Sequence, residues 1–431
     1  MSLKRVLRVA AAGVVLSAIT LDGFAASSSA SVLHDTVVSD NPSDITPHLV
    51  ADTTVARPHV DAFAQSSGTM YAGGVFNTVT DASRSQTYLR TNLVSFDAVT
   101  GALTSFAPAI DGRVHALAAT SDALYVGGTF ATVDGIPRRA LVKIDSATGT
   151  VNTAFDAHLL SGKVNDLQLV DNRLFVAGTA GKKLMALDPI TGNNTGYVNL
   201  EIGGRLEGSN GGTSITKFSV NVQGTQLAAV GNFTTVAGRI RHRAFLADLG
   251  STTATLDPWY YNALTRPCSA TVAARQAYLT DVDFSPDGTY FVVVATGYIP
   301  RPGDLGQTVC DAAARFDVDI ATPDRPVWLN YTGGDTIYSV AVTGAAVYVQ
   351  GHFDYLDNPD GTNTAGPGAV VRRGVGAINP VSGVALDWNP DAPAKIGGYG
   401  LYATPQGIWF GADSQRFGAE YHRGIAFTPL Q

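Results

Sequence analysis

The chain has 431 residues and a formal net charge of −7, and it contains 46 glycines, 45% hydrophobic residues and 15% charged residues. This composition is typical of a globular, turn-rich protein and excludes an intrinsically disordered one. Because recognition of phosphates needs a basic stripe, and basic residues occur here only singly or in short runs, nucleic acid is excluded as the expected partner.

The first predicted element is a secretory signal peptide over residues 1–30. The basic stretch MSLKRVLR precedes the apolar run Val9–Leu21, and small residues follow at Gly23–Ala25 and Ser28–Ala30. The apolar run is too short to span a bilayer comfortably. We therefore expect a secreted, extracellular protein without membrane insertion, and a linker over residues 31–47.

A repeated motif occupies most of the remaining chain. The pattern YxGGxF and its variants occur at Tyr71–Phe76, Tyr125–Phe130, Phe175–Ala180, Ala228–Phe233, Val293–Tyr298, Tyr348–Phe353 and Trp409–Ser414. A period of about 55 residues indicates a repeat architecture. Within each copy, apolar β-prone runs are separated by turns such as Asp-x-x-Thr-Gly at Asp145–Gly149. This pattern predicts four short strands per copy, A to D, and makes Asp145 a turn former.

Seven such copies over residues 48–431 predict an all-β fold, a single seven-bladed β-propeller of four-stranded blades. The last copy stops at HRGIAFTPLQ, which supplies a strand C but no strand D. The segment His48–Pro58 precedes the first strand A, and we expect it to supply the missing strand. Such pairing would close the ring and leave no exposed sheet edge.

The repeat resembles a known family. Its YxGGxF, Gly-x-x-Arg loop, (L/I)-x-x-(I/F)-D-x-x-T-G and Phe-x-Pro elements are similar to the delta-60 repeat and to the fungal cortical-marker propellers. The stretch from Val309 to Trp388 further resembles secreted actinobacterial propellers of unassigned activity. The resemblance implies a propeller over nearly the whole mature chain. It implies no catalytic residue, because that group has no established reaction.

The long connections are all expected on one face. In a four-stranded meander, the D-to-A and B-to-C connections share a face, and the longest ones are residues 77–92, 257–278, 300–314 and 354–374. We call this the loop-rich face, and binding usually resides in such loops. Cys268 and Cys310 are the two cysteines of the chain, and both lie in these loops. In an exported protein they predict a disulfide.

A polar ring is predicted at the mouth of the axial channel. One position of strand A is polar in every copy, namely Asp61, His115, Asn165, Thr216, Thr280, Tyr338 and Tyr399. Two residues later every copy is apolar, from Phe63 to Leu401, and we expect these side chains on the same face. The ring has two interpretations, side chains that bind channel water or the floor of a ligand pocket. In the second, the ligand-binding residues are Asp61, His115, Asn165, Tyr338 and Tyr399.

The candidate catalytic residues lie above this ring. They are Asp335 in the stretch GGDT, and His352 and Asp413 at the ends of neighbouring B strands. His352 replaces a small residue of other copies and stands near acids, so it is a candidate acid–base group. The alternative is a histidine that only forms structural hydrogen bonds.

The loop DYLDNPDG contains three aspartates, Asp354, Asp357 and Asp360. Calcium prefers several hard oxygens in a flexible loop, so these residues are calcium candidates. The Asn-Pro-Asp-Gly sequence is also an ordinary turn signal, and the spacing does not match an EF-hand. No other cofactor is expected.

The four tryptophans are assigned to packing between blades rather than to stacking on sugars. Trp259, Trp328 and Trp388 occupy the strand D position of Phe106, and Trp409 takes the place of a motif tyrosine in strand B. Large rings supply much of the area buried between sheets.

These observations predict a monomeric, secreted binding protein that recognises an extracellular glycan or a cell-surface protein on its loop-rich face. The alternative function is a glycoside hydrolase or lyase acting on polysaccharide, with acids and a histidine at the funnel mouth. Glycoside hydrolysis needs paired carboxylates at a suitable separation. The distance between two carboxylates does not follow from the sequence alone. A purely structural or adhesive role is the third possibility, and catalysis is not the expected function.

Overall fold

The computed structural model describes residues 32–269, 275–393 and 397–431, so the predicted signal peptide lies outside the described residues. Within these ranges the chain consists of β-strands, turns and one 3-10 turn at Asn262–Thr265. Nothing helical in the described ranges has the length and apolar character of a membrane span. The predicted all-β class is confirmed.

The strands form antiparallel sheets that repeat the order A, B, C along the chain. In the described residues, the A strands are β2 (His59–Ser66), β7 (Arg113–Ala119), β12 (Val164–Val170), β16 (Ser214–Val220), β22 (Tyr278–Phe284), β26 (Thr336–Val342) and β31 (Gly398–Thr404). The B strands are β3 (Thr69–Val75), β8 (Ala123–Thr129), β13 (Arg173–Gly178), β17 (Gln226–Asn232), β23 (Tyr290–Thr296), β27 (Val347–His352) and β32 (Gly407–Ala412). The C strands are β6 (Leu93–Asp97), β11 (Leu141–Asp145), β14 (Leu184–Leu187), β20 (Ala244–Leu249), β24 (Ala312–Asp317), β30 (Val375–Ile378) and β35 (Ile425–Pro429).

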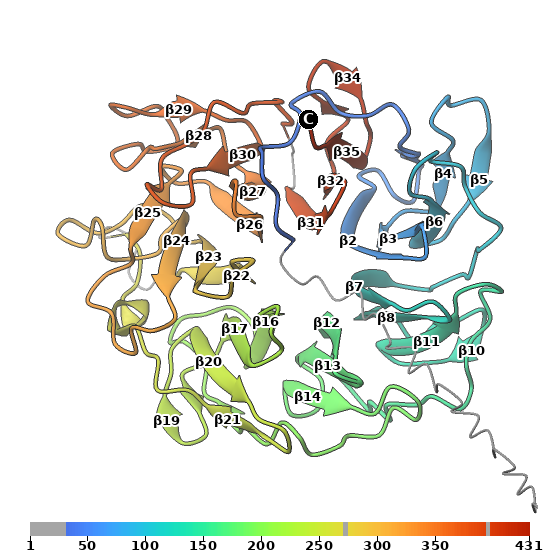
Figure 1. The fold of residues 1–431 in the computed structure, drawn as a ribbon, viewed down its shortest axis with the longest axis horizontal. Helices are drawn as coiled ribbons and strands as arrows, with labels where there is room; N and C mark the ends of the chain where they lie inside the picture. Colours follow the sequence, from blue (N-terminus) through green and yellow to red (C-terminus); the bar gives the residue numbers. More distant parts are fainter. Residues whose placement is uncertain (1–31, 270–274, 394–396) are drawn as a thin grey trace, which may run out of the picture.

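The sheets surround a central axis, with the A strands innermost (Figure 1). Each A strand contacts the next A strand along the chain, and β31 contacts β2, so the first sheet lies beside the last. The apolar core is divided accordingly into clusters between neighbouring sheets. All four tryptophans belong to these clusters and are at most 7% exposed, which confirms their assignment to packing.

The fourth strand is shorter than predicted. Among the described residues, only two sheets have a D strand, β21 (Ala254–Leu256) and β25 (Trp328–Tyr331). Elsewhere the D segment makes a single bridge, as between Phe96 and Leu103. After that bridge the aromatic side chain of the segment turns into the core, where Phe106 packs edge-on against Tyr71 with ring centroids 5.4 Å apart.

The N-terminal segment runs differently from the prediction. β1 (His48–Val50) pairs with β4 (Thr78–Thr80) and not with β35, although the Leu49 amide donates to the Arg423 carbonyl at 2.9 Å. Residues after β1 form a turn, because the Asp52 carboxylate accepts hydrogen bonds from the amides of Thr54 and Val55, each at 2.7 Å. The prediction that residues 48–58 form the closing strand is therefore wrong.

The segment predicted as a linker occupies that place beside β35. Val38 bridges Leu430, and the Ser39 and Ser43 amides donate to the carbonyls of Pro429 and Phe427, each at 2.8 Å. Val38 is 2% exposed and belongs to the core cluster of the last sheet. Residues 38–43, which we call the closing segment, thus connect the start of the described chain to its end.

The B-to-C connections carry small hairpins outside the main sheets. In the described residues these hairpins are β4–β5 (Thr87–Leu89), β9 (Thr132–Val133)–β10 (Ile136–Pro137), β18 (Thr235–Val236)–β19 (Arg239–Ile240), β28 (Tyr355–Leu356)–β29 (Val370–Val371) and β33 (Arg416–Phe417)–β34 (Glu420–Tyr421). A short strand β15 (Ile202–Gly203) extends the pair β18–β19. The B-to-C connections of the loop-rich face therefore have a regular framework.

The two cysteines form the predicted disulfide. Cys268 lies in the connection that leads into β22, and Cys310 lies between β23 and β24. Both side chains are buried and pack with Ala277 and Tyr298 in a small cluster of their own. The bond thus joins two long connections of the fifth sheet.

Reduction of this disulfide, or the substitution Cys268→Ser, is expected to lower the free energy of unfolding by about 2–4 kcal/mol, because the unfolded chain gains conformational entropy. Thermal melts with and without reductant measure the effect. Melting temperatures that do not change on reduction and in Cys268→Ser would show that the bond contributes no stability.

Candidate functional site

The predicted polar ring coincides with a set of β-bulges. In every A strand the register with the B strand shifts by one residue, as between Val60 and Ala62 in β2. The seven inserted residues are the seven ring residues, Asp61, His115, Asn165, Thr216, Thr280, Tyr338 and Tyr399. A bulge places two residues of one strand opposite one residue of its partner strand. Beyond the bulge, each side chain therefore points to the opposite face of the sheet from the one that strict alternation predicts.

The bulges overturn the prediction made for the positions beyond the ring. The apolar residues expected on the ring face pack between neighbouring sheets, and Phe63, Leu117, Leu167, Phe218, Val282, Val340 and Leu401 each belong to, or pack against, a different core cluster. The residue directly after the bulge faces the channel instead. This position is occupied by Asp166, Lys217 and Asp281 in three successive A strands, which places charge in the channel.

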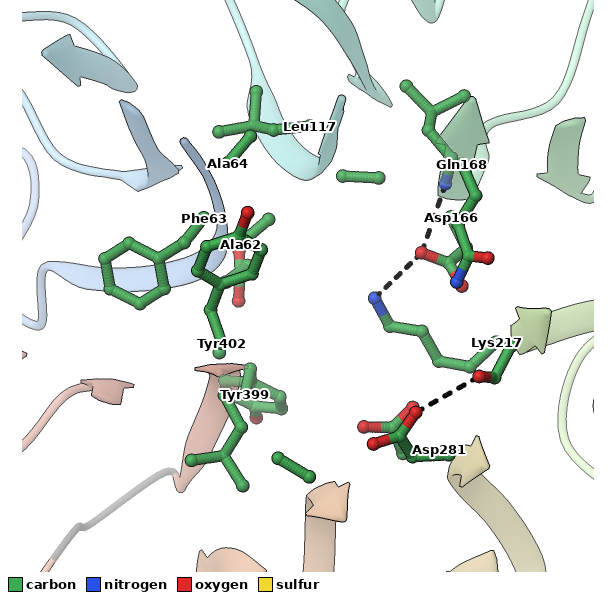
Figure 2. Close-up of a pocket in the computed structure, with 18 of the residues that line it drawn as sticks. Ala62, Phe63, Ala64, Leu117, Asp166, Gln168, Lys217, Asp281, Tyr399 and Tyr402 are labelled. Carbon is green, nitrogen blue, oxygen red and sulfur yellow. Dashed lines mark hydrogen bonds and ion pairs between the residues drawn. The ribbon is translucent and has the colours of Figure 1, made fainter. Parts of the chain in front are cut away.

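A cavity of about 100 Å³ lies among the A strands and contains what we call the channel cluster, Asp166, Lys217, Asp281 and Asp283. Figure 2 shows Asp166, Lys217 and Asp281 around this cavity. The Lys217 Nζ lies 3.4 Å from Asp166 Oδ1. This cluster was not predicted, although charged residues within otherwise apolar strands were a visible signal.

The carboxylates of the channel cluster bridge neighbouring A strands. Asp166 accepts a hydrogen bond from the Phe218 amide at 3.0 Å, and Asp281 accepts one from the Val340 amide at 3.0 Å. Asp283 accepts from Val342 at 2.8 Å. Because these oxygens already bind the backbone of the next sheet, the cluster holds the inner strands together and is not the best candidate for a ligand site.

Burial dominates the ionisation of the channel cluster. It raises the pKa of Asp281 and of Asp283 to about 7 and also raises the pKa of Asp166. For Lys217 burial alone would lower the pKa, but the nearby carboxylates, Asp166 first, outweigh it and raise the pKa. Lys217 therefore stays charged at neutral pH and compensates buried carboxylates.

Three of the predicted ligand-binding residues come together at the channel mouth. Arg113 donates from Nε and Nη2 to the two carboxylate oxygens of Asp61, each at 2.7 Å. The guanidinium also lies 5.2 Å from the ring centroid of Tyr399, which lies 4.7 Å from the ring of Tyr338. His59 packs against Tyr399 with centroids 5.8 Å apart. We call these five residues the mouth cluster.

The mouth cluster combines a buried, hydrogen-bonded carboxylate with side chains that are partly exposed to solvent. Asp61 is 4% exposed in its side chain and is held by the bidentate Arg113, whose side chain is 35% exposed. Tyr338 and Tyr399 are half-buried. The cluster thus offers aromatic surface and guanidinium donors in a fixed arrangement, which is the composition of many small-molecule sites.

The side chains of the other two predicted ligand-binding residues form their hydrogen bonds outside this cluster. The Nε2 of His115 lies 2.9 Å from Thr129 Oγ1, and burial with the nearby charge of Arg113 lowers the pKa of His115 to about 3. His115 is therefore neutral and a poor acid–base group. Asn165 donates to the Ile215 carbonyl at 2.7 Å, which ties its side chain to the next A strand.

Two of the candidate catalytic residues are neighbours. Asp335 directly precedes β26 and His352 ends β27, and Thr336 is paired with His352 in the register of these strands. Burial raises the pKa of Asp335, with His352 opposing the rise. Asp413 follows β32 in the next sheet and accepts a hydrogen bond from the Gly397 amide at 3.3 Å.

A further carboxyl near Asp335 was not predicted. Asp311 is 2% exposed, and its Oδ1 has no hydrogen-bond partner in the described part of the chain. Burial raises the pKa of Asp311 to about 7, and the neighbouring Asp335 contributes to the rise. Asp311 lines a cavity of about 410 Å³ together with Arg275 and Tyr278. Its position directly after Cys310 was the available signal.

The three calcium candidates do not gather around one point. Asp357 accepts hydrogen bonds from the Asn330 side chain and the Ala385 amide, the latter at 3.0 Å, and so fixes its own loop. Asp354 and Asp360 are exposed. Among described residues, no group of three potential metal ligands includes any of these aspartates. The geometry gives no support to calcium at this loop.

No protein-family model matches the chain, and no curated protein matches it. Among solved structures, the chain is similar to the crystal structure of the WD40 β-propeller domain of Doa1, with a TM-score of 0.47 and 10% identity, over 90% of this chain and 96% of that one. The resemblance to the delta-60 repeat stays a prediction, and the propeller-like arrangement rests on the order of the strands and the contacts between the sheets.

Proposed function

We propose that the chain is a secreted, monomeric, seven-bladed propeller that binds an extracellular glycan at the mouth of its channel, on the loop-rich face. The cyclic contacts of the A strands support the closed ring, with the closing segment beside β35 in place of a D strand. The buried disulfide is compatible with an extracellular protein.

The single observation that carries this proposal is the mouth cluster. Two half-buried tyrosine rings lie beside a guanidinium that Asp61 holds in place. Aromatic faces pack well on the C–H faces of sugar rings, and a fixed guanidinium donates hydrogen bonds to hydroxyl or carboxylate oxygens. A surface protein is the competing ligand, and it would be expected to bury the exposed hairpins of the loop-rich face as well.

The substitution Tyr399→Ala is expected to weaken binding of the best glycan by about 10–30-fold, because it removes the ring that contacts both Arg113 and Tyr338. A glycan array identifies that glycan, and calorimetry measures the affinity. Tyr260→Ala is the matched control, since Arg241 lies 5.4 Å from the Tyr260 ring away from the channel. Equal affinities for all three proteins would place the glycan elsewhere, and an array without hits would favour a protein ligand.

A second function, cleavage of a polysaccharide, is favoured by one observation. Asp335 contributes to the raised pKa of Asp311, and Asp311 is a buried carboxyl whose Oδ1 has no hydrogen-bond partner among the described residues and lies beside a cavity. Two carboxyls in different environments are what a glycoside hydrolase needs. Product analysis of any bound glycan separates the two functions: cleavage abolished by Asp311→Asn would favour the enzyme, and intact glycan would favour binding alone.

A further inference from the structure

A group of potential metal ligands lies outside the channel, where the two ends of the described chain meet. Asp44, Glu420 and His422 each offer a ligand atom, and these atoms all lie within 4.8 Å of one another. Asp44 follows the closing segment directly, whereas Glu420 and His422 belong to or follow the hairpin β33–β34 of the last sheet. The group therefore joins two segments that are far apart in sequence.

The histidine is oriented as a metal ligand would be. Its side chain is 2% exposed, and Nδ1 lies 2.9 Å from the hydroxyl of Thr46, which is itself fully buried. This contact fixes the ring and directs Nε2 toward Glu420 Oε2 at 3.3 Å. Metal-binding histidines are commonly held in this way through the other ring nitrogen.

The distance between the histidine nitrogen and one carboxylate oxygen suits zinc. A tetrahedral Zn²⁺ with ligands at about 2.0–2.1 Å keeps its ligand atoms about 3.3–3.4 Å apart. The distance between His422 Nε2 and Glu420 Oε2 already has this value, 3.3 Å. One imidazole and two carboxylates with a free fourth position for water form a chemically reasonable zinc site.

The charges of the group also favour a cation. The carboxylates of Asp44 and Glu420 lie near each other, and among the described residues no lysine or arginine forms an ion pair with either of them. The guanidinium of Arg84 lies over the ring of Tyr421 at 4.9 Å, and Arg416 Nη1 donates to the Ala419 carbonyl at 2.8 Å. A divalent cation between the carboxylates would remove their repulsion.

We propose that Asp44, Glu420 and His422 bind one Zn²⁺, and that this ion clamps the closing segment to the last sheet. The Ser43 amide donates to the Phe427 carbonyl at 2.8 Å, so a ligand at Asp44 continues the pairing that holds the closing segment beside β35. The ion stabilises the junction between the two ends of the ring, because it binds only when both segments are in place.

The test is zinc binding by the full secreted chain after treatment with EDTA and removal of the chelator. Calorimetry with ZnCl₂ is expected to show one equivalent bound, and saturating zinc is expected to raise the melting temperature. His422→Gln, which can keep the contact with Thr46, is expected to weaken binding at least about 10-fold and to abolish the shift in melting temperature. Glu420→Gln is a second variant with almost unchanged shape.

The matched control is His158→Gln. His158 lies 3.6 Å from Asp156, so it forms the same kind of histidine–carboxylate pair on the surface without a third ligand. This variant is expected to bind zinc as the unmodified chain does. Absence of binding by the unmodified chain, or equal affinities of the unmodified chain, His422→Gln and Glu420→Gln, would overturn the proposal and leave an ordinary ion pair between His422 and Glu420.

Discussion

Replacing Lys217 by methionine is expected to lower the free energy of unfolding by about 3–5 kcal/mol at about pH 8, because it leaves buried carboxylates without their cation. Lys217 pairs with Asp166, and the charges of Asp281 and Asp61 also act on it. Methionine has nearly the same length and apolar stem, so little packing is lost. Chemical denaturation of the unmodified chain and of the variant measures the difference.

The decrease in the free energy of unfolding caused by Lys217→Met is expected to become smaller as the pH falls. The pKa of Asp281 and of Asp283 is about 7 in the folded chain, above the ordinary value of 3.8. A raised pKa means that the folded state binds protons more tightly than the unfolded state. The stabilisation of the folded state that results from this tighter proton binding is complete below about pH 4. It is lost as the pH rises through about 7. At about pH 5 these carboxyls are protonated, so fewer buried charges need Lys217.

Lys143→Met is the control for this effect. Lys143 is also partly buried, and its ammonium lies 3.1 Å from the Pro189 carbonyl and 5.3 Å from the Tyr125 ring. It has no place in the channel cluster, and its loss is expected to cost no more than about 1 kcal/mol at either pH. If Lys217→Met and Lys143→Met cost the same, or if the cost of the former did not depend on pH, the channel cluster would not be a compensated set of buried charges.

The repeat motif was informative because its residues have the same physical task in the sheets that keep them. The first glycine of a YxGG pair allows close packing of neighbouring sheets: a Cβ at Gly73 would collide with Val114, and one at Gly127 with Val164. The motif tyrosines pack against the aromatic rings of the D segments, as Tyr71 packs against Phe106. Such tasks restrict the sequence in several copies, so the strands, their order and the tryptophan positions could be predicted.

Which side chains face the channel could not be predicted from strict alternation, because a bulge leaves no mark in the sequence. The ring residues themselves were identified, but strict alternation was assumed beyond them. One inserted residue in each A strand reversed the alternation, so Asp166, Lys217 and Asp281 became channel residues. The place of the closing segment was missed for a related reason, since a single bridge at Val38 is too short to show a strand pattern.

Replacing Trp409 by alanine is expected to lower the free energy of unfolding by about 3–5 kcal/mol, as loss of a large buried ring usually does. Trp409 is 1% exposed and stacks on Phe427 with ring centroids 4.5 Å apart. On its other side it contacts Phe96 at 5.5 Å and Phe63 at 6.1 Å, both from the first sheet. The ring therefore fills the interface at which the last sheet meets the first.

The region of the chain that Trp409→Ala destabilises tests whether this interface closes the ring. In Trp409→Ala, hydrogen exchange is expected to increase first at β2 and β35, because their shared core becomes a cavity. Trp259→Ala is the matched variant, since Trp259 is 0% exposed and packs with Phe291 and Phe316 in the fifth sheet. It should cost a similar amount but expose β22 to β25. The same exchange pattern in both variants would contradict a closing role for Trp409, since the loss would then be a global one.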